Sequence, residues 1–367
     1  MVAVELGLRA IVSRRGGYYR YTPHWRERLD HSRIDIPGFP ATSLVEINSE
    51  GERGGPAPAE SENCYRVLVV GGSAAECYHL DQRATWSAVV ERILGEPENR
   101  ARLRTPRVHV GNVARAIVPV GPMRFMLEKL LRRYRKLDAI VLMTGASDIV
   151  SWMERGAPAN ISEDAHRFGL DRLFEHHPEK QWGTRPSETA MWRTLSQWNR
   201  RLRKPIVEEP GLSAWLPRVR KMRAEAPTRI DEVPDATELF DNFERDLRGL
   251  LRLLQKSATR VVLARQPWFG PNPTAEEEAM FWNFGLGRPY KEQVSSYFTP
   301  RVVDALMTEM DRRASKIALE VGVEQIDVAS RMERSARTFY DELHFTPAGA
   351  EQVGRIVAEQ LLRHRPS

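Results

Sequence analysis

The sequence predicts an α/β fold of three layers, in which helices cover both faces of a five-stranded parallel sheet and a largely helical insertion forms a cap. Two observations predict this fold class. Short apolar runs rich in β-branched residues recur along the chain, and they alternate with longer segments of helical periodicity. One segment, 151–235, interrupts this alternation and is too long for a simple crossover connection.

The interruption divides the chain into three parts. We expect residues 1–62 to form an N-terminal lead-in arm, with a short strand at 44–47 followed by a loop rich in glycine, proline and glutamate. We expect 63–150 and 236–367 to form the core, and 151–235 to form the insertion. A chain of 367 residues exceeds the size at which a single core usually stops growing, so an insertion or a second lobe is expected.

The core is predicted to contain five strands and three long helices. The predicted strands are 67–70, 108–110, 139–143, 261–264 and 326–328, and the long helices are 122–134, 239–255 and 301–321. In a sheet of this kind all strands run in one direction, so their carboxyl ends meet at one edge. We expect the functional residues at that edge.

The first core strand ends in a Gly-Gly-Ser turn. Residues 67–73 read Val-Leu-Val-Val-Gly-Gly-Ser, so Ser73 follows the strand directly. Glycines permit a tight turn in which the backbone approaches a ligand, and the free N–H groups at a helix start favour negative charge. A phosphate-binding loop would begin in the same way, but no Gly-Lys-Ser/Thr follows the glycines. Ser73 is therefore a candidate nucleophile.

A second motif lies near the other end of the chain. Asp341 and His344 are three residues apart, so a single turn can direct both side chains the same way. A carboxylate that holds one imidazole nitrogen leaves the other nitrogen to face a serine hydroxyl. The alternative is an ordinary loop followed by a helix cap. The presence of both motifs, with parallel strands between them, favours a catalytic triad.

Together the two motifs resemble the SGNH, or GDSL-like, hydrolase family. Residues 71–77, Gly-Gly-Ser-Ala-Ala-Glu-Cys, are similar to the Gly-Gly-Ser variant of the family's first block, and residues 340–349 are similar to its last block. The resemblance extends, with gaps, from about residue 47 to residue 361. It implies the family's flavodoxin-like sheet, with Ser73 as nucleophile, His344 as base and Asp341 as the group that orients the base.

The resemblance also implies an oxyanion hole. In the family, a glycine N–H from the second block and an asparagine side chain from the third block join the N–H of the nucleophile, here Ser73. The second block of this chain offers Gly111 or Ala114 as the backbone donor, and both remain open. In the third block Ser147 stands where the family has asparagine, and its hydroxyl donates one hydrogen bond.

Aromatic residues gather in the insertion and after the fourth core strand. We expect Trp268, Phe269 and Trp282 to line a substrate pocket over Ser73, although packing within a small cap is a compatible alternative. The adjacent histidines 176–177 raise the alternative of a metal site. No acidic or thiol residue has ligand spacing to them, so neither a metal nor another cofactor is expected.

The composition, 41% hydrophobic and 28% charged, is typical of a globular protein. The net charge of +6 is spread along the chain, and the densest basic run, 129–136, has the spacing of a solvated helix face, so no nucleic-acid partner is expected. Two cysteines, Cys64 and Cys77, do not make a disulfide framework.

No apolar run approaches the length of a membrane span, and residues 1–12 lack the pattern of a signal peptide. We therefore expect no stable membrane span and a cytoplasmic location. Residues 6–15 could instead form a short basic amphipathic helix that touches a membrane, although a docked terminus is favoured.

The expected function is that of a serine ester hydrolase acting on a small-molecule or carbohydrate acyl ester. Two alternatives stay open. An acyltransferase would use the same triad but pass the acyl group to an alcohol. A non-catalytic binding protein would retain the fold while Ala114 and Ser147 mark a decayed oxyanion hole. The sequence makes no prediction of the oligomeric state.

Overall fold

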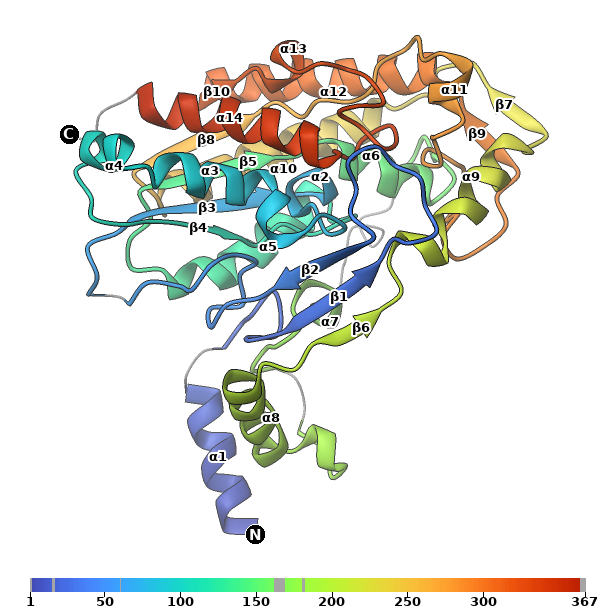
Figure 1. The fold of residues 1–367 in the computed structure, drawn as a ribbon. Coiled ribbons are helices and arrows are strands. Elements are labelled where there is room, and N and C mark those ends of the chain that lie inside the picture. Colours follow the sequence, from blue (N-terminus) through green and yellow to red (C-terminus); the bar gives the residue numbers. More distant parts are fainter. Residues whose placement is uncertain (1, 15–16, 60, 162–168, 180–181, 364–367) are drawn as a thin grey trace.

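The computed structural model describes the chain except for residues 1, 15–16, 60, 162–168, 180–181 and 364–367. At its centre lies a five-stranded sheet in which every neighbouring pair of strands is parallel (Figure 1). The strand order is β10-β8-β5-β3-β4, which is 2-1-3-4-5 when the five strands are counted along the chain. This is the flavodoxin-like order. The predicted fold class is confirmed. The strands are β3 (Tyr65–Gly71), β4 (Val108–Asn112), β5 (Ala139–Met143), β8 (Arg260–Ala264) and β10 (Glu324–Ile326).

The central strand, β3, shows why the sheet is buried on both faces. Its side chains alternate between two hydrophobic clusters: Leu68 and Val70 point into one, and Val67 and Val69 into the other. All four are at most 1% exposed. A strand buried on both faces must be apolar throughout, which is why the run was recognisable in the sequence.

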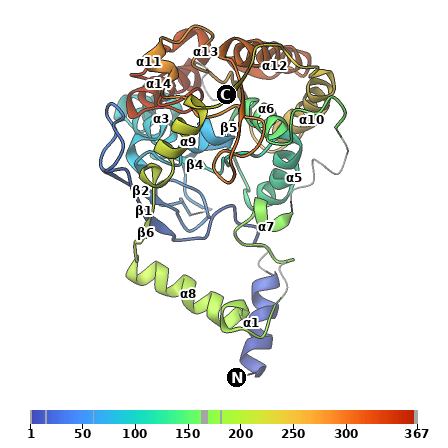
Figure 2. The ribbon, with the colours of Figure 1, turned by 90° about the vertical axis from the view of Figure 1, so that its right-hand side faces the viewer.

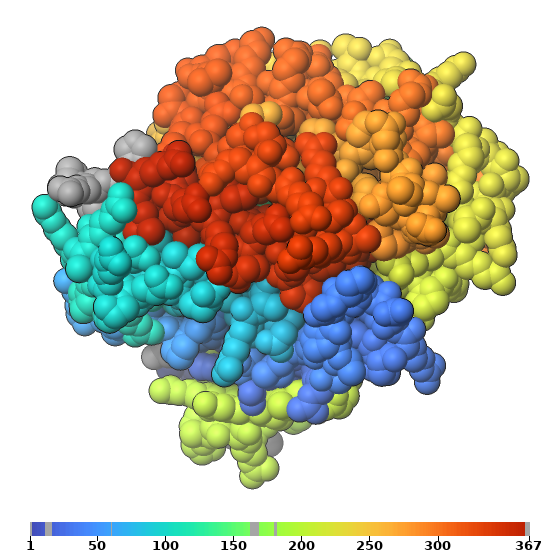
Figure 3. Space-filling model, turned by 45° about the horizontal axis from the view of Figure 1, so that its top comes forward, coloured from blue at the N-terminus to red at the C-terminus, as the bar shows by residue number. Residues whose placement is uncertain are grey.

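Helices cover each face of the sheet. The first cluster is completed by α5 (Val120–Leu130), α10 (Thr237–Gln255) and α12 (Pro300–Glu320), and the second by α3 (Trp86–Leu94) and α14 (Pro347–Arg363). Figure 3 views the molecule from the side that α14 covers, where the C-terminal segment lies against the segment that holds α3. The helices predicted at 122–134, 239–255 and 301–321 correspond to α5, α10 and α12.

The last predicted strand, 326–328, was placed too late. β10 ends at Ile326, and Asp327 caps the next helix, α13 (Val328–Arg331), by accepting the N–H of Ser330 at 2.9 Å. An aspartate that caps a helix ends the strand before it. The single strand predicted in the arm, 44–47, corresponds to β2 (Thr42–Glu46).

The lead-in arm and the insertion share a second, three-stranded sheet. In it β1 (Arg26–Asp30) pairs antiparallel with β2 and parallel with β6 (Val207–Glu209). The helices α1 (Val2–Arg14) and α8 (Ala190–Arg203) contact each other and project from the body on this side (Figure 2). The division into arm, core and insertion stays a prediction, but the arm is joined to the insertion by backbone pairing.

None of the helices in the described part of the chain is both long and apolar enough to cross a membrane. Shorter elements complete the fold. A third sheet consists of the parallel pair β7 (Thr228–Ile230) and β9 (Ser296–Phe298). The remaining α-helices are α2 (Ser73–Glu76), α4 (Pro97–Leu103), α6 (Ala146–Met153), α7 (Leu170–Leu173), α9 (Leu216–Ala224) and α11 (Ala275–Glu278).

Candidate active site

The Gly-Gly-Ser turn places Ser73 at the carboxyl end of β3, at the point where strand order reverses between β3 and β5. Gly71 has φ +157°, and a Cβ there would lie 2.1 Å from the carbonyl oxygen of Met143. The next residue, Gly72, donates its N–H to the same carbonyl at 3.2 Å. The turn therefore requires glycine at 71. Ser73 begins the one-turn helix α2, where its N–H faces no helical carbonyl.

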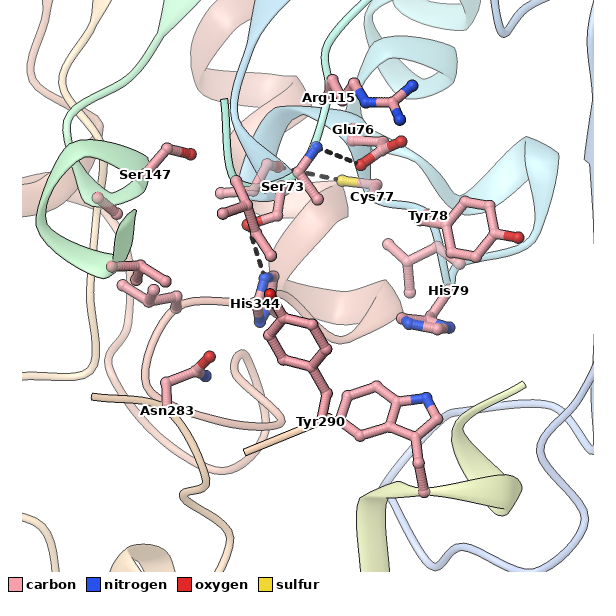
Figure 4. A pocket seen from close by; sticks show the side chains of 18 of the residues that line it. Ser73, Glu76, Cys77, Tyr78, His79, Arg115, Ser147, Asn283, Tyr290 and His344 are labelled. Carbon is pink, nitrogen blue, oxygen red and sulfur yellow. Dashed lines mark hydrogen bonds between the residues drawn. The ribbon is translucent and has the colours of Figure 1, made fainter. Parts of the chain in front are cut away.

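The structure brings Ser73, His344 and Asp341 into one hydrogen-bonded chain. The distance from Ser73 Oγ to His344 Nε2 is 2.8 Å (Figure 4), and the distance from His344 Nδ1 to Asp341 Oδ2 is 2.7 Å. An ionised carboxylate only accepts, so Nδ1 carries the proton and Nε2 is left to accept from the serine. The other oxygen of Asp341, Oδ1, accepts the backbone N–H groups of Leu343 and His344, each at 2.8 Å.

Two aromatic residues hold this histidine. The indole Nε1 of Trp282 donates to Asp341 Oδ2 at 2.7 Å, and its ring lies within 8° of parallel to the ring of His344. The ring of Tyr340 is 16° from parallel to the imidazole, with 5.6 Å between centroids. Contacts with two nearly parallel rings restrict the rotation of the imidazole.

The charges of the site favour a carboxylate paired with a basic histidine. Asp341 is fully buried, which would raise its pKa, but the hydrogen bond and charge of His344 and the two backbone donors hold the pKa below its ordinary value. For His344, burial would lower the pKa, and the adjacent Asp341 outweighs this effect, so the pKa is raised above its ordinary value. Such a base takes a proton from serine more readily than a free imidazole.

A second buried carboxylate, Glu342, fixes the loop that carries Trp282. Its Oε2 accepts the backbone N–H of Trp282 at 3.2 Å and both the backbone and side-chain nitrogens of Asn283, at 3.3 and 3.1 Å. Burial raises the pKa of Glu342, and the guanidinium of Arg223 lies 3.6 Å from its Oε1. Glu342 therefore connects the motif of residues 341–344 to the loop after the fourth core strand.

A cavity of about 800 Å³ opens over Ser73. Its wall is contributed by the core, the N-terminal arm and the insertion, through side chains such as Trp25, Trp215 and Trp282. Figure 4 shows several polar side chains that also line it: Glu76, Tyr78, His79, Arg115, Ser147, Asn283 and Tyr290.

The predicted oxyanion donors fall into two groups. Ser147, at the start of α6, lines the cavity, and its Oγ would lie 2.3 Å from a Cβ added to Gly72, so it is adjacent to the turn that carries Ser73. Ala114 and Gly111 do not line the cavity. The N–H of Ala114 donates to Asn112 Oδ1 at 2.9 Å, and a Cβ on Gly111 would lie 2.5 Å from the carboxylate of Glu52. The N–H of Ala114 is therefore engaged by Asn112.

Only one of the three aromatic residues predicted for the substrate pocket lines the cavity. Trp282 lines the cavity, whereas Trp268 and Phe269 are buried in the two hydrophobic clusters beside the sheet and do not line it. The indole of Trp268 donates to Asp304 at 2.7 Å, away from Ser73. All three residues lie between β8 and β9, and only Trp282 lines the cavity.

Several residues at the site were not predicted from the sequence. Glu76 is one turn after Ser73, and it accepts the N–H of Ala116 at 2.7 Å and the hydroxyl of Tyr21 at 2.6 Å. His79 lines the cavity, and burial lowers its pKa to about 3, so it is neutral. The position of Glu76, three residues after the serine on the same helical turn, was the available signal. No local signal places Tyr21, from the N-terminal arm, at this site.

Of the residues considered for other chemistry, Cys77 lines the cavity and His177 does not. In the described part of the chain, no group of three histidine, cysteine, aspartate or glutamate side chains could hold a metal ion. His177 pairs with Asp171, with 3.1 Å between Nε2 and Oδ1. Cys77 follows α2 as a buried free thiol whose pKa burial raises to about 12, so it is protonated and unreactive.

Comparison with known proteins gave matches among solved structures only. No protein-family model matches the chain, and no curated protein matches it. The chain is similar in structure to Axe2, an acetylxylan esterase from Geobacillus stearothermophilus, with 12% identity, 84% of this chain and 98% of that chain covered, and a TM-score of 0.44. It is also similar to a member of the lipolytic protein G-D-S-L family from Veillonella parvula, with 10% identity, 82% and 100% covered, and a TM-score of 0.41. A third is LAE5, an alpha/beta hydrolase enzyme from the metagenome of Lake Arreo, with 12% identity, 84% and 100% covered, and a TM-score of 0.43.

Proposed function

We propose that this chain is a serine carboxylic-ester hydrolase of the SGNH type. One observation carries the proposal: an unbroken chain of hydrogen bonds runs from Asp341 through His344 to Ser73, and Ser73 faces a cavity. A nucleophile, a base and an orienting carboxylate in this arrangement are the groups that acyl transfer requires.

In the first half of the reaction, Ser73 Oγ attacks the carbonyl carbon of the ester while His344 Nε2 takes the hydroxyl proton. The carbonyl oxygen becomes an oxyanion. When this tetrahedral intermediate collapses, the carbon–oxygen bond to the alcohol breaks, and the leaving alkoxide takes the proton from His344. The alcohol departs and the acyl group remains on Ser73.

In the second half, water attacks the acyl carbon and gives its proton to the same nitrogen of His344. Collapse returns that proton to Ser73 Oγ and releases the carboxylic acid. Throughout, Asp341 holds the imidazole orientation and stabilises the imidazolium. The enzyme ends in its starting state with one ester bond hydrolysed.

We assign the oxyanion to the N–H of Ser73 and the hydroxyl of Ser147. The first is supported by the position of Ser73 at the start of α2, and the second by the proximity of Ser147 Oγ to Gly72. Gly111 and Ala114, the other candidates, have less support because neither lines the cavity. A site with a hydroxyl in place of an amide donor is expected to be functional but slower.

The cavity supports an acyl ester of a carbohydrate or of a small polar metabolite as substrate. Its volume of about 800 Å³ exceeds what an acetyl group needs, so the alcohol part of the ester must fill most of it. Exposed faces of Trp215 and Trp282 offer flat apolar walls, and Asn283 and Tyr290 offer polar groups. This combination suits a compact ring with several hydroxyl groups.

The experiment measures release of p-nitrophenol from esters of acetyl to long acyl chains, for the native chain and for Ser73→Ala. We expect hydrolysis that falls with acyl length and is lost in Ser73→Ala. Added alcohols or sugars test the acyltransferase alternative, which predicts acyl transfer to the acceptor in preference to water. Absence of both reactions in the native chain would support the non-catalytic alternative and contradict the proposal.

A further inference from the structure

The apolar surface of this molecule is concentrated on one projection, which we call the α1–α8 projection and define as residues 2–14 and 190–203. In the described part of the chain, eight of the eleven exposed large hydrophobic side chains belong to it. Figure 2 shows both helices extending beyond the body, and Figure 3 shows the α8 segment at the edge of the molecule. The eight side chains are Val2, Val4, Leu6, Ile11, Trp192, Leu195, Trp198 and Leu202.

The two helices form one unit through specific contacts. Glu5 of α1 accepts the backbone N–H groups of Ala190 and Met191, at 2.8 and 2.9 Å, which are orphan donors at the start of α8. Arg9 pairs with Glu5 at 2.6 Å and donates to the carbonyl of Gly183 at 3.2 Å. The sole carboxylate of α1 is therefore committed to holding α8.

On α8 the exposed apolar side chains share one face. Trp192, Leu195, Trp198 and Leu202 fall within about 120° of arc at 100° per residue, and each is more than half exposed. Monomeric proteins seldom expose two tryptophans and two leucines on one helical face without a partner for them.

The charge of α8 is one-sided as well. From Thr189 to Lys204 the chain has no acidic residue and five basic ones, and Arg201, Arg203 and Lys204 are exposed at the carboxyl end of the helix. An apolar face with tryptophan and leucine next to a basic face is the pattern of helices that lie in the interface of an anionic membrane. If a second copy met this projection with its own, two basic helix ends would come together, which is unfavourable.

We propose that the α1–α8 projection docks the protein on an anionic lipid surface, with Trp198 and Leu202 inserted at the headgroup boundary and Arg201 and Arg203 facing the headgroups. This docking is peripheral, because no described helix is long and apolar enough to span a membrane. It is independent of the proposed chemistry at Ser73. The projection continues through β6 into the sheet whose β1 and β2 side chains line the cavity.

The test is flotation of the full chain with vesicles of phosphatidylglycerol and, separately, of phosphatidylcholine. We expect binding to the anionic vesicles, weakened by 0.5 M salt, and little binding to the neutral ones. Trp198→Ser with Leu202→Ser should weaken binding at least about tenfold, since the burial of either side chain accounts for that factor. Leu319→Ser with Val233→Ser is the matched control, because both residues are exposed on the body, and it should bind as the native chain does.

A second variant, Arg201→Glu with Arg203→Glu, leaves the apolar face intact and should also weaken binding to phosphatidylglycerol. The melting temperature of each variant establishes that it is folded. Failure of the native chain to bind either vesicle overturns the proposal, and so does binding that the α8 variants leave unchanged. Sedimentation velocity without lipid tests whether a second copy binds this face instead. If the native chain is a dimer and the variant with Trp198→Ser and Leu202→Ser is a monomer, the face binds a second copy and the proposal is overturned.

Discussion

Trp282 and His344 donate to the same oxygen of Asp341, each at 2.7 Å. The carboxylate therefore shares its charge between the base and an indole that also lines the substrate cavity. Because Glu342 holds the backbone of Trp282, the orientation of the base depends on a loop that is 60 residues from Glu342 in sequence. Trp282 is in this account a positioning residue for His344.

Replacing Trp282 by phenylalanine tests this role. The variant keeps an aromatic wall but leaves Asp341 Oδ2 with one donor fewer. Asp341 then attracts the proton on His344 more strongly, and because Trp282 no longer fixes the carboxylate, the imidazole is held less rigidly. We expect kcat/KM to fall about tenfold, as for the loss of one hydrogen bond to a charged group. The acid limb of the pH profile should move to higher pH.

The matched control is Trp268→Phe. Trp268 also donates its indole N–H to a carboxylate at 2.7 Å, that of Asp304, but it is buried away from the cavity. It should leave the pH profile unchanged. An equal shift in both variants would mean that the effect of Trp282→Phe is structural.

The pKa of His344 sets the pH dependence of activity. The base must be neutral to take a proton, so activity is present above its pKa and is lost as the pH falls through it. Since Asp341 raises that pKa above the ordinary value of 6.5, the acid limb of kcat/KM in the free enzyme should have its midpoint above pH 6.5. Asp341→Asn should lower the rate by about 10⁴-fold and move any residual limb to lower pH.

Ser147 is expected to stabilise the oxyanion. Ser147→Ala removes the hydroxyl and should lower kcat by about 10- to 100-fold with little change in KM, because the bond forms mainly in the transition state. Thr144→Ala removes a neighbouring buried hydroxyl that has no hydrogen-bond partner, and it should leave kcat unchanged. If Ser147→Ala keeps native kcat, the oxyanion is held by other groups.

Replacing Gly72 by alanine is a separate test of the proximity of Ser147 to the turn that carries Ser73. A Cβ at this position would overlap Ser147 Oγ at 2.3 Å, so Gly72→Ala should lower both the melting temperature and the rate. Adding Ser147→Gly to that variant removes the overlapping atom and should restore much of the melting temperature without restoring the rate. Calorimetry measures the melting temperatures of the single and double variants. If the double variant melts no higher than Gly72→Ala, the added Cβ overlaps with an atom other than Ser147 Oγ.

A buried pair, formed by His109 of β4 and Glu52, makes the stability of the fold depend on pH. His109 Nε2 lies 2.9 Å from Glu52 Oε2, and although burial lowers the pKa of this histidine, the carboxylates of Glu52 and Glu91 raise it to about 9. A folded-state pKa above the unfolded value of 6.5 stabilises the fold fully below pH 6.5, and the stabilisation is lost as the pH rises through 9. It amounts to at most about 3 kcal/mol.

Urea unfolding of the native chain and of His109→Gln between pH 6 and pH 10 measures this contribution. The free energy of unfolding of the native chain should fall relative to that of the variant across this range. Parallel curves would show that His109 is neutral throughout.

The sequence predicted that Ser73 and His344 meet, because a local sequence pattern marks each of the two residues. Ser73 follows a strand that is recognisable from its continuous apolar run, and the spacing of Asp341 and His344 fits a single turn. The five strands were recognised for the same physical reason, since strands buried on both faces are apolar throughout. Only β10 was misplaced, because Asp327 ends it with a helix cap.

What the sequence did not predict depends on contacts between distant segments. The pairing of β1 with β6 joins residues about 180 positions apart, and neither strand is apolar enough to stand out. Trp268 and Trp282 each have an aromatic neighbour in the sequence, and only the path of the chain decides which one reaches the cavity. The capture of the Ala114 N–H by Asn112 did have a local signal, because an asparagine often accepts the N–H two residues ahead.

The most direct measurement of the central claim is covalent labelling by a fluorophosphonate, followed by intact-mass and peptide analysis. Only a serine activated by its base reacts readily with this reagent. We predict a single adduct on Ser73, absent in Ser73→Ala and strongly slowed in His344→Gln, each variant being folded by its melting temperature. No adduct in the native chain, or one that persists in Ser73→Ala, would contradict the assignment of Ser73 as the nucleophile.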